Sequence, residues 1–220
     1  MRAAQRKSPA GYDVHPSVAM AQNRIAGLKQ KTGRSLEEWV RLVKNEGPAE
    51  EKQRREWLKS KHGLGTNYAW WIAEQSVGKG SDGSPEAYLK SADDYVETMF
   101  AGSKAGLRPL YHALLKLGRS MGKDVRVCPC QTMVPLFRNY VFAQIKPATR
   151  TRIDLGLALK DTKAPRRLID TGGFAKKDRI THRIEIDSLD DIDEEVKRWL
   201  KKAYAMDAAV RKGPPPGKRT

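Results

Sequence analysis

The chain of 220 residues has two cysteines, four histidines and no long hydrophobic run. Only one proline separates Cys128 from Cys130, a spacing too short for an ordinary disulfide, so a disulfide-rich scaffold is excluded. No segment approaches the roughly 20 apolar residues that span a bilayer, and the first residues lack the apolar core of a secretory signal. These absences predict a reduced, cytoplasmic protein without a membrane contact.

Motifs for catalysis are also missing. The sequence contains no Gly-x-Ser-x-Gly, no Walker loop, no His-Glu-x-x-His and no Cys-x-x-Cys. Cys128 and Cys130 could hold a metal only together with distant ligands. We therefore expect no catalytic residue, no cofactor and no metal, and a binding protein is favoured over an enzyme.

Positive charge is the most unusual feature of the composition. The 42 lysines and arginines against 26 acidic residues give a net charge of +16. Residues 102–183 alone hold 18 basic and 5 acidic residues. Such an excess favours a polyanionic partner, above all nucleic acid, although a basic protein without any specific partner is the alternative.

Changes in composition and period divide the chain into five segments. They are a flexible leader at 1–19, a helical module at 20–77, the linker "GKGSDGSP" at 78–85, a second domain at 86–206 and a disordered basic tail at 207–220. In the helical module, Ser35 and Glu38 have the spacing of a capping box, and Gly47 ends the helix. Two more helices are expected at 49–61 and 67–77.

The second domain is expected to be α+β. Ser84 can cap a helix that starts at Pro85, and leucines at three- and four-residue spacing predict another helix at 107–121. After Gly122 the apolar period changes to two, most clearly in "TRIDLGLAL" and "RITHRIEID". A last helix is expected at 190–206. The fold class is therefore a small helix-hairpin-helix-like domain followed by an antiparallel sheet of about four or five strands, packed with two or three helices.

The stretch "LKSKHGLGTNYAWWI" places Gly63 and Gly65 between two expected helices. In a helix-hairpin-helix, such a turn leaves backbone N–H groups bare at the start of the second helix, where they can hold a phosphate. The residues expected to contact nucleic acid are Lys59, Lys61, Gly63, Gly65, Thr66 and Asn67, and His62 could add charge. The alternative is a tight turn that serves helix packing only.

Two further surfaces follow from the strand and helix patterns. Arg138, Lys146, Arg150, Arg152 and Arg183 could form one basic sheet face along a phosphate backbone, or simply a solvated outer face. Trp70 and Trp71 point about 100° apart on a helix, so one of them should be exposed and could meet a protein partner.

Two parts of the chain resemble domains of a bacterial two-module family. "KTGRSLEEWVRLVKNEG" and "WLKSKHGLGTNYAWWI" resemble a helical domain of unknown function, whereas "TRIDLGLALK" and "THRIEI" resemble an α+β domain of unknown function that commonly follows it. The resemblance covers about residues 20–206. Its matching positions in the second domain are Thr151, Arg152, Asp154, Gly156, Thr181 and His182, whereas Pro135 and Cys128-Pro-Cys130 interrupt its strands.

The second domain is also distantly similar to frataxin-like iron chaperones, which implies an alternative function. In that alternative, Arg152, Asp154 and His182 form a small-ligand pocket, or Asp190 and Asp193 bind iron. The residue patterns favour simpler roles, because His182 lies on the apolar side of its strand and acids at a helix start cap it. The leading prediction is a non-enzymatic protein that contacts the nucleic-acid backbone without strong sequence specificity.

Overall fold

The computed structural model describes residues 7–78, 84–165 and 167–208, and it divides the chain into two compact units. The helical unit comprises Val14–Leu89. The α+β unit comprises residues 7–13 together with residues 90–208, apart from residue 166.

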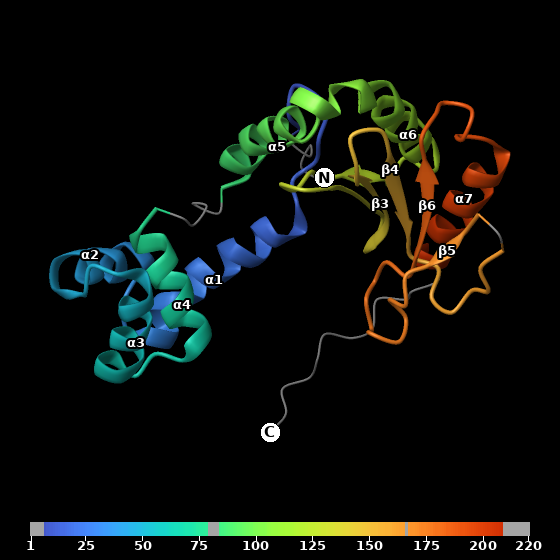
Figure 1. Cartoon of the computed structure of the whole chain (residues 1–220). Coiled ribbons are helices and arrows are strands. Elements are labelled where there is room, and N and C mark those ends of the chain that lie inside the picture. The colour runs from blue at the N-terminus through green and yellow to red at the C-terminus, as the bar shows by residue number, and fades with distance from the viewer. Residues whose placement is uncertain (1–6, 79–83, 166, 209–220) are drawn as a thin grey trace. The chain divides into compact units, whose positions relative to one another are not determined.

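Four helices form the core of the helical unit (Figure 1). They are α1 (Pro16–Thr32), α2 (Leu36–Glu46), α3 (Glu51–His62) and α4 (Thr66–Ser76). The predicted capping box is confirmed, because the Ser35 side chain accepts the Glu38 N–H at 3.2 Å and Glu38 accepts the Ser35 N–H at 2.6 Å. Trp39 fixes α2 against α1 by donating its indole N–H to Thr32 at 2.8 Å. The buried cluster that these helices share contains Leu28, Trp39, Val43, Leu58, Leu64, Ala69, Ile72 and Ala73.

The α+β unit is built on an antiparallel sheet, as expected, but with six strands instead of four or five. The strands are β1 (Arg126–Val127), β2 (Val134–Phe137), β3 (Val141–Pro147), β4 (Ile153–Leu157), β5 (Ile169–Asp170) and β6 (His182–Ile186), in the order β1-β2-β3-β4-β6-β5. The two edge strands, β1 and β5, are only two residues long. Helices α5 (Pro85–Met99), α6 (Arg108–Ser120) and α7 (Glu194–Ala208), and the 3-10 helix η1 (Gly102–Leu107), complete the elements.

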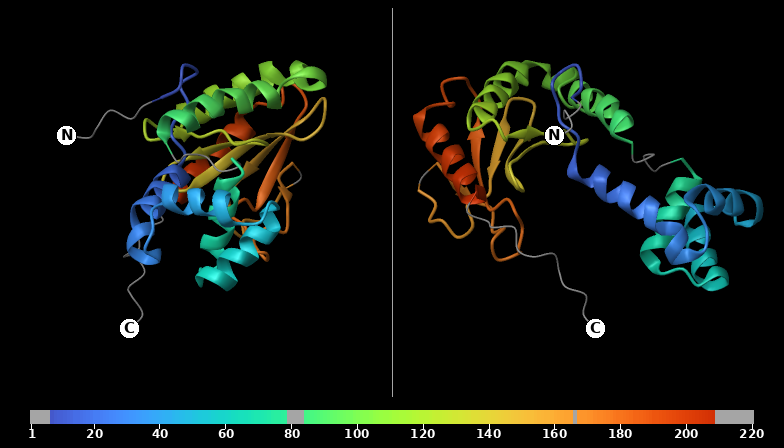
Figure 2. Two further views of the ribbon diagram at one scale, coloured as in Figure 1. Left: turned by 90° about the vertical axis from the view of Figure 1, so that its left-hand side faces the viewer. Right: turned by 180° about the vertical axis from the view of Figure 1, so that it is seen from behind.

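Side-chain alternation gives the sheet a core face and a polar face. Ile145, Leu155 and Ile184 are paired across β3, β4 and β6 and are fully buried, or nearly so. Helices α6 and α7 both contact β3 (Figures 1 and 2). A Cβ on Gly118 of α6 would come within 2.5 Å of the Leu136 side chain, so the helix lies very close to β2 at this point.

The flexible leader predicted for residues 1–19 is wrong for its described part, residues 7–19. Asp13 donates its N–H to the Val127 carbonyl at 2.7 Å, and its carboxylate accepts the Val127 N–H at 2.9 Å. Tyr12 is 4% exposed, and α1 already starts at Pro16. The leader has no hydrophobic period because it is held by single contacts with β1 and α6.

The helical unit is longer than the predicted module at 20–77, because it comprises Val14–Leu89. The Ser84 hydroxyl accepts the Ala87 N–H at 3.1 Å, which confirms the expected cap of α5. Residues 79–83 of the predicted linker and 209–220 of the predicted tail lie outside the described residues. Asp207, assigned to the tail, instead belongs to α7 and is buried.

Cys128 and Cys130 are both free. Burial raises the pKa of the Cys128 thiol to about 12, so this thiol stays protonated. Strand β1 covers only Arg126–Val127, because Cys130 donates its N–H to the Met133 carbonyl at 2.9 Å and closes a turn.

Candidate functional site

The turn between α3 and α4 has the conformation that its two glycines suggest. Gly63 ends α3 with a φ of 63°, a left-handed conformation that favours glycine, and donates its N–H to Lys59 at 3.1 Å. Leu64, between the glycines, is buried in the core of the helical unit. The turn is therefore anchored by Leu64, while the glycines on either side are exposed.

Gly65 is the N-cap of α4, and its side-chain position is open. Its carbonyl accepts the N–H groups of Tyr68 and Ala69, both at 3.0 Å, but no side chain caps this helix. In the described part of the chain, the N–H groups of Gly65, Thr66 and Asn67 have no hydrogen-bond partner. A Cβ on Gly65 would meet no atom within 4 Å. The first turn of α4 therefore presents donors and the positive end of the helix dipole to solvent.

The charges expected around this turn are partly balanced. Lys59 lies 3.2 Å from Glu56, and Lys61 lies 3.9 Å from Glu46. His62 packs between Trp39 and Trp57, with ring centroids 5.4 and 4.4 Å away. Burial, and then the nearby charges of Arg34 and Lys61, lower the pKa of His62. His62 is therefore neutral at neutral pH, and the expectation that it adds positive charge is wrong.

A surface hollow of about 470 Å³ adjoins the first turn of α4. It is lined by Arg24, Asn67, Trp70, Trp71 and Glu74. Trp70 is 48% exposed, and its indole N–H donates to Glu74 at 2.7 Å. The expectation that one of the two tryptophans is exposed is confirmed for Trp70, whereas Trp71 is half-buried.

The basic sheet face is largely neutralised. Arg152 pairs with Asp154 at 3.1 Å and with Glu185 at 3.0 Å, and Arg183 pairs with the same two acids at 2.6 and 3.0 Å. Strand register causes this, because Asp154 and Glu185 are direct cross-strand partners.

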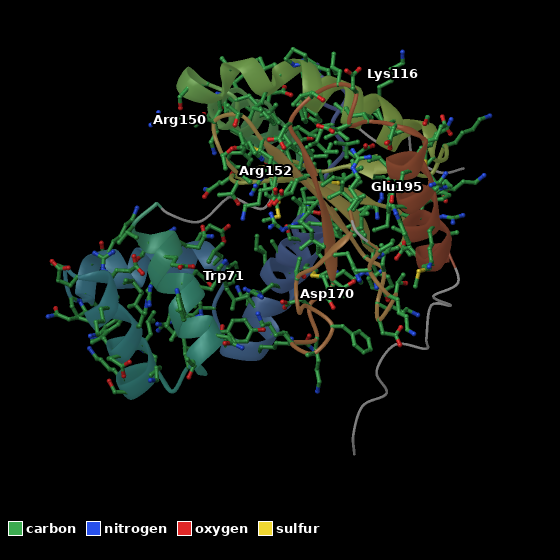
Figure 3. All side chains as sticks on the ribbon, turned by 45° about the vertical axis from the view of Figure 1, so that its right-hand side comes forward. Trp71, Lys116, Arg150, Arg152, Asp170 and Glu195 are labelled. Carbon is green, nitrogen blue, oxygen red and sulfur yellow. The ribbon has the colours of Figure 1, made fainter. Side chains whose placement is uncertain are left out.

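The remaining basic residues differ in how accessible they are. Arg138 pairs with Asp124 at 2.7 Å and lies over the Tyr204 ring. Lys146 and Arg150 are exposed and form no ion pair with a described residue. Figure 3 shows Arg150 at the margin of the α+β unit and Arg152 among the side chains of the sheet.

The ligand pocket predicted from Arg152, Asp154 and His182 is not formed. His182 is the cross-strand partner of Leu157, whereas Asp154 pairs with Glu185, so His182 and Asp154 project from opposite faces. The His182 ring is buried and lies 2.8 Å from both the Thr181 hydroxyl and the Thr162 carbonyl. It is the hydrogen-bonded core histidine that its place in the strand pattern favoured.

The acids before α7 cap the helix and its preceding turn. Asp193 accepts the N–H groups of Glu195 and Val196, both at 3.0 Å, and pairs with Arg167 at 2.6 Å. Asp190 is exposed. Within the described ranges, no three histidine, cysteine or acidic side chains come together as a metal site, so the alternative of iron at Asp190 and Asp193 gains no support.

Sequence reasoning missed a hollow in the α+β unit. It has a volume of about 600 Å³ and is formed by the loops after β4 and before β6 together with the end of α7. Lys160, Phe174, Lys177 and Arg179 are among its lining residues. The available signal was the stretch "TGGFAKKDR", which combines two glycines, an aromatic residue and three cations between two strands.

Two domain families match the chain. Residues 20–76 match a domain of unknown function, DUF4287, and residues 96–207 match a second domain of unknown function, DUF5655. Neither a curated protein nor a solved structure matches the chain. Among the helices that the structure describes, none has both the length and the apolar composition needed to cross a membrane. Because the second match extends over half of the chain, the protein belongs to the DUF5655 family and carries a DUF4287 domain before it.

Proposed function

We propose that the chain is a non-enzymatic binding protein whose helical unit contacts the phosphate backbone of nucleic acid without strong sequence specificity. The observation that supports this is the open first turn of α4, where three backbone N–H groups have no partner and no side chain lies over Gly65 among the described residues. A phosphate there would receive hydrogen bonds from the backbone and favourable interaction with the helix dipole.

The neighbouring hollow supports the same proposal. Asn67 belongs to the first turn of α4 and also lines the hollow with Arg24 and Trp70. Arg24 can approach a second phosphate, and the face of the exposed Trp70 ring that Arg55 does not cover can stack on a sugar or base. Backbone N–H groups and unspecific stacking read no base edge, so the binding has no strong sequence specificity.

The net charge supports long-range attraction by the α+β unit. Lys146 and Arg150 contribute most in this proposal, because Arg138 and Arg152 are already paired with acids. The free thiols of Cys128 and Cys130 fit a reducing compartment, and we assign the binding to the cytoplasm.

Binding to labelled duplex DNA, and to RNA of the same sequence, tests the proposal by fluorescence anisotropy. The affinity of the full chain should fall steeply between about 50 and about 200 mM salt. Gly65→Asp should weaken binding by about tenfold, because its carboxylate caps the N–H groups and repels phosphate. Gly27→Asp is the matched control, since it adds the same charge to α1, where a new Cβ meets only the end of the Lys31 side chain.

Two results would overturn the proposal. One is the absence of binding to both nucleic acids at low salt. The other is equal affinity of the Gly65→Asp and Gly27→Asp variants, which would show that the first turn of α4 makes no contact.

A protein partner is the second candidate, and the exposure of Trp70 favours it. In that case the helical unit would bind through the Trp70 ring and not through backbone N–H groups. A defined protein complex that is lost in Trp70→Ala but kept in Gly65→Asp, together with no salt-dependent nucleic-acid binding, would support the protein partner.

A further inference from the structure

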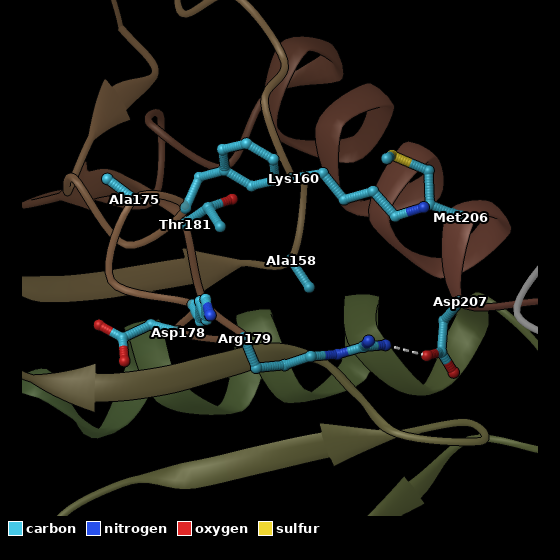
Figure 4. A pocket seen from close by; sticks show the side chains of 10 residues that line it. Ala158, Lys160, Ala175, Asp178, Arg179, Thr181, Met206 and Asp207 are labelled. Carbon is cyan, nitrogen blue, oxygen red and sulfur yellow. Dashed lines mark hydrogen bonds and ion pairs between the residues drawn. The ribbon is translucent and has the colours of Figure 1, made fainter.

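The cavity of the α+β unit has the size of a small-molecule site. Its volume of about 600 Å³ lies within the range of ligand pockets, and it is formed entirely within one unit. The lining residues are Ala158, Lys160, Phe174, Ala175, Lys177, Asp178, Arg179, Thr181, Met206 and Asp207. Figure 4 shows the side chains of Lys160 and Arg179 extending toward α7, with Met206 and Asp207 beyond them.

Two lysines of this cavity have a strained backbone. Lys160 has a φ of 55° and Lys177 a φ of 60°, and no other non-glycine residue in the described ranges has a positive φ. Glycine would adopt these angles without steric cost. Neither ammonium group forms an ion pair with a described residue. Because backbone strain at two sites converges on one cavity, we infer that the two ammonium groups are needed there.

The cavity also presents an aromatic ring on a fixed loop. Phe174 is 54% exposed, so it contributes little to the core. Its loop is nevertheless held by the Asp178 N–H donating to Gly173 at 2.8 Å and the Lys177 N–H donating to Phe174 at 3.1 Å. A Cβ on Gly173 would come within 2.4 Å of the Ile180 carbonyl, so the loop packs tightly on its own base. An exposed ring on a preorganised loop is suited to stacking.

The charge of the cavity favours an anion. Asp207 is 2% exposed and is fully engaged by Arg179 and by the N–H groups of Asn139 and Tyr140, so this acid does not oppose an anionic ligand. The Asp178 carboxylate points away from Lys160 and Arg179 (Figure 4). Lys160 and Lys177, which form no ion pair within the described part of the chain, thus line the cavity beside an apolar surface of alanine, methionine and phenylalanine.

We propose that this cavity binds a mononucleotide, with its phosphate on the lysine ammonium groups of the cavity and its base against Phe174. The ammonium groups match a compact dianion, and the ring matches a planar base. The basic segment 209–220 of the chain, with four cations and no acid, does not complement the cavity. This site belongs to the other unit and shares no residue with the proposed nucleic-acid contact, so each proposal can fail alone.

Isothermal titration of the full chain with AMP, GMP, CMP and UMP tests the proposal. Adenosine and ribose 5-phosphate serve as half-ligands that lack the phosphate or the base. At least one mononucleotide should bind more tightly than either half-ligand. If adenosine binds as tightly as AMP, the lysines do not bind the phosphate. If ribose 5-phosphate binds as tightly as AMP, Phe174 does not bind the base. If no mononucleotide binds, the site is rejected.

Matched variants make the assignment specific. Phe174→Ala and Lys177→Gly should each weaken mononucleotide binding by about tenfold. Leu189→Ala, which alters an exposed apolar residue outside the cavity, and Lys176→Ala, beside Lys177, should leave it unchanged. Gly65→Asp should also leave mononucleotide binding unchanged, and Phe174→Ala should leave the binding of duplex DNA unchanged. Equal losses in the cavity variants and their controls would overturn the proposal.

Discussion

The hydroxyl groups of Tyr12 and Tyr111 lie 2.8 Å apart, and both side chains are buried. This hydrogen bond joins the N-terminal segment to α6 over 99 positions of sequence. Burial raises the pKa of both phenols, so each is a neutral hydroxyl that needs a partner. The segment before the helical unit is thus a structural part of the α+β unit.

Tyr12→Phe should lower the free energy of unfolding by about 1–3 kcal/mol, because the buried Tyr111 hydroxyl loses its partner. The double variant Tyr12→Phe, Tyr111→Phe should cost less than the sum of the single changes. Urea unfolding followed by circular dichroism measures both. Tyr140→Phe, at an exposed tyrosine, is the control and should change stability by less than about 0.5 kcal/mol. If the losses of unfolding free energy in the two single variants add up in the double variant, the two hydroxyl groups are not coupled.

Local signals in the sequence predicted most elements, and long-range contacts account for what they missed. The capping pair Ser35 and Glu38 and the alternation from Ile153 to Leu157 depend on near neighbours, so they are visible in the sequence. Tyr12 looked flexible because its partner is distant in the chain. The neutralisation of Arg152 depends on the register between β4 and β6, which no local pattern determines.

The candidate sites also differ in whether local sequence or long-range contacts form them. The open turn around Gly65 was predictable because one short motif contains it. The cavity around Lys160 was not, because two loops and a helix that are separated in sequence build it. The left-handed φ of Lys160 has no local signature either, since lysine is ordinary in most loops.

Lys160→Gly should raise stability while it removes an ammonium group from the cavity. Relief of the left-handed conformation contributes about 1 kcal/mol, partly offset by the greater freedom of glycine in the unfolded chain. Thermal unfolding should therefore shift upward by about 2 °C. Lys163→Gly, at an exposed position without a positive φ, should instead be neutral or destabilising. A lower melting temperature for Lys160→Gly would show that its backbone is not strained.

Removing the charge of Asp193 should change how stability depends on pH. The pKa of Asp193 lies below its ordinary value of about 3.9, mainly because its carboxylate accepts the Val196 N–H and further because Arg167 is close. The stabilisation is thus present above pH of about 4 and is lost as the pH falls through the folded-state pKa. Asp193→Asn keeps a good N-cap but lacks the charge. Its unfolding free energy should be lower than that of the parent at pH about 7, and this difference should shrink at pH about 3.

Asp154→Asn should increase the positive charge of the polar sheet face, because it removes one of the two acids that pair with Arg152 and Arg183. Arg152 and Arg183 would then share only Glu185, and the unfolding free energy should fall by about 1 kcal/mol because these groups are partly exposed. Salt-dependent nucleic-acid affinity should rise more than in Asp161→Asn, which removes the same charge from an exposed position. Equal affinities in the two variants would show that this face does not meet nucleic acid.

The stability of the helical unit should fall below neutral pH because of His62. Its Nε2 atom is buried without a partner in the described structure, and its ring contacts Trp39 and Trp57. Since burial lowers the folded-state pKa, the unfolded chain takes up a proton first, and stability decreases as the pH falls from about 6.5 toward the folded-state pKa. His62→Phe keeps a ring between the tryptophans but cannot titrate. Urea unfolding followed by tryptophan fluorescence at pH about 7.5 and about 5.5 should show a smaller pH effect in His62→Phe than in the parent or in His112→Phe, and an undiminished effect would assign the titration to another group.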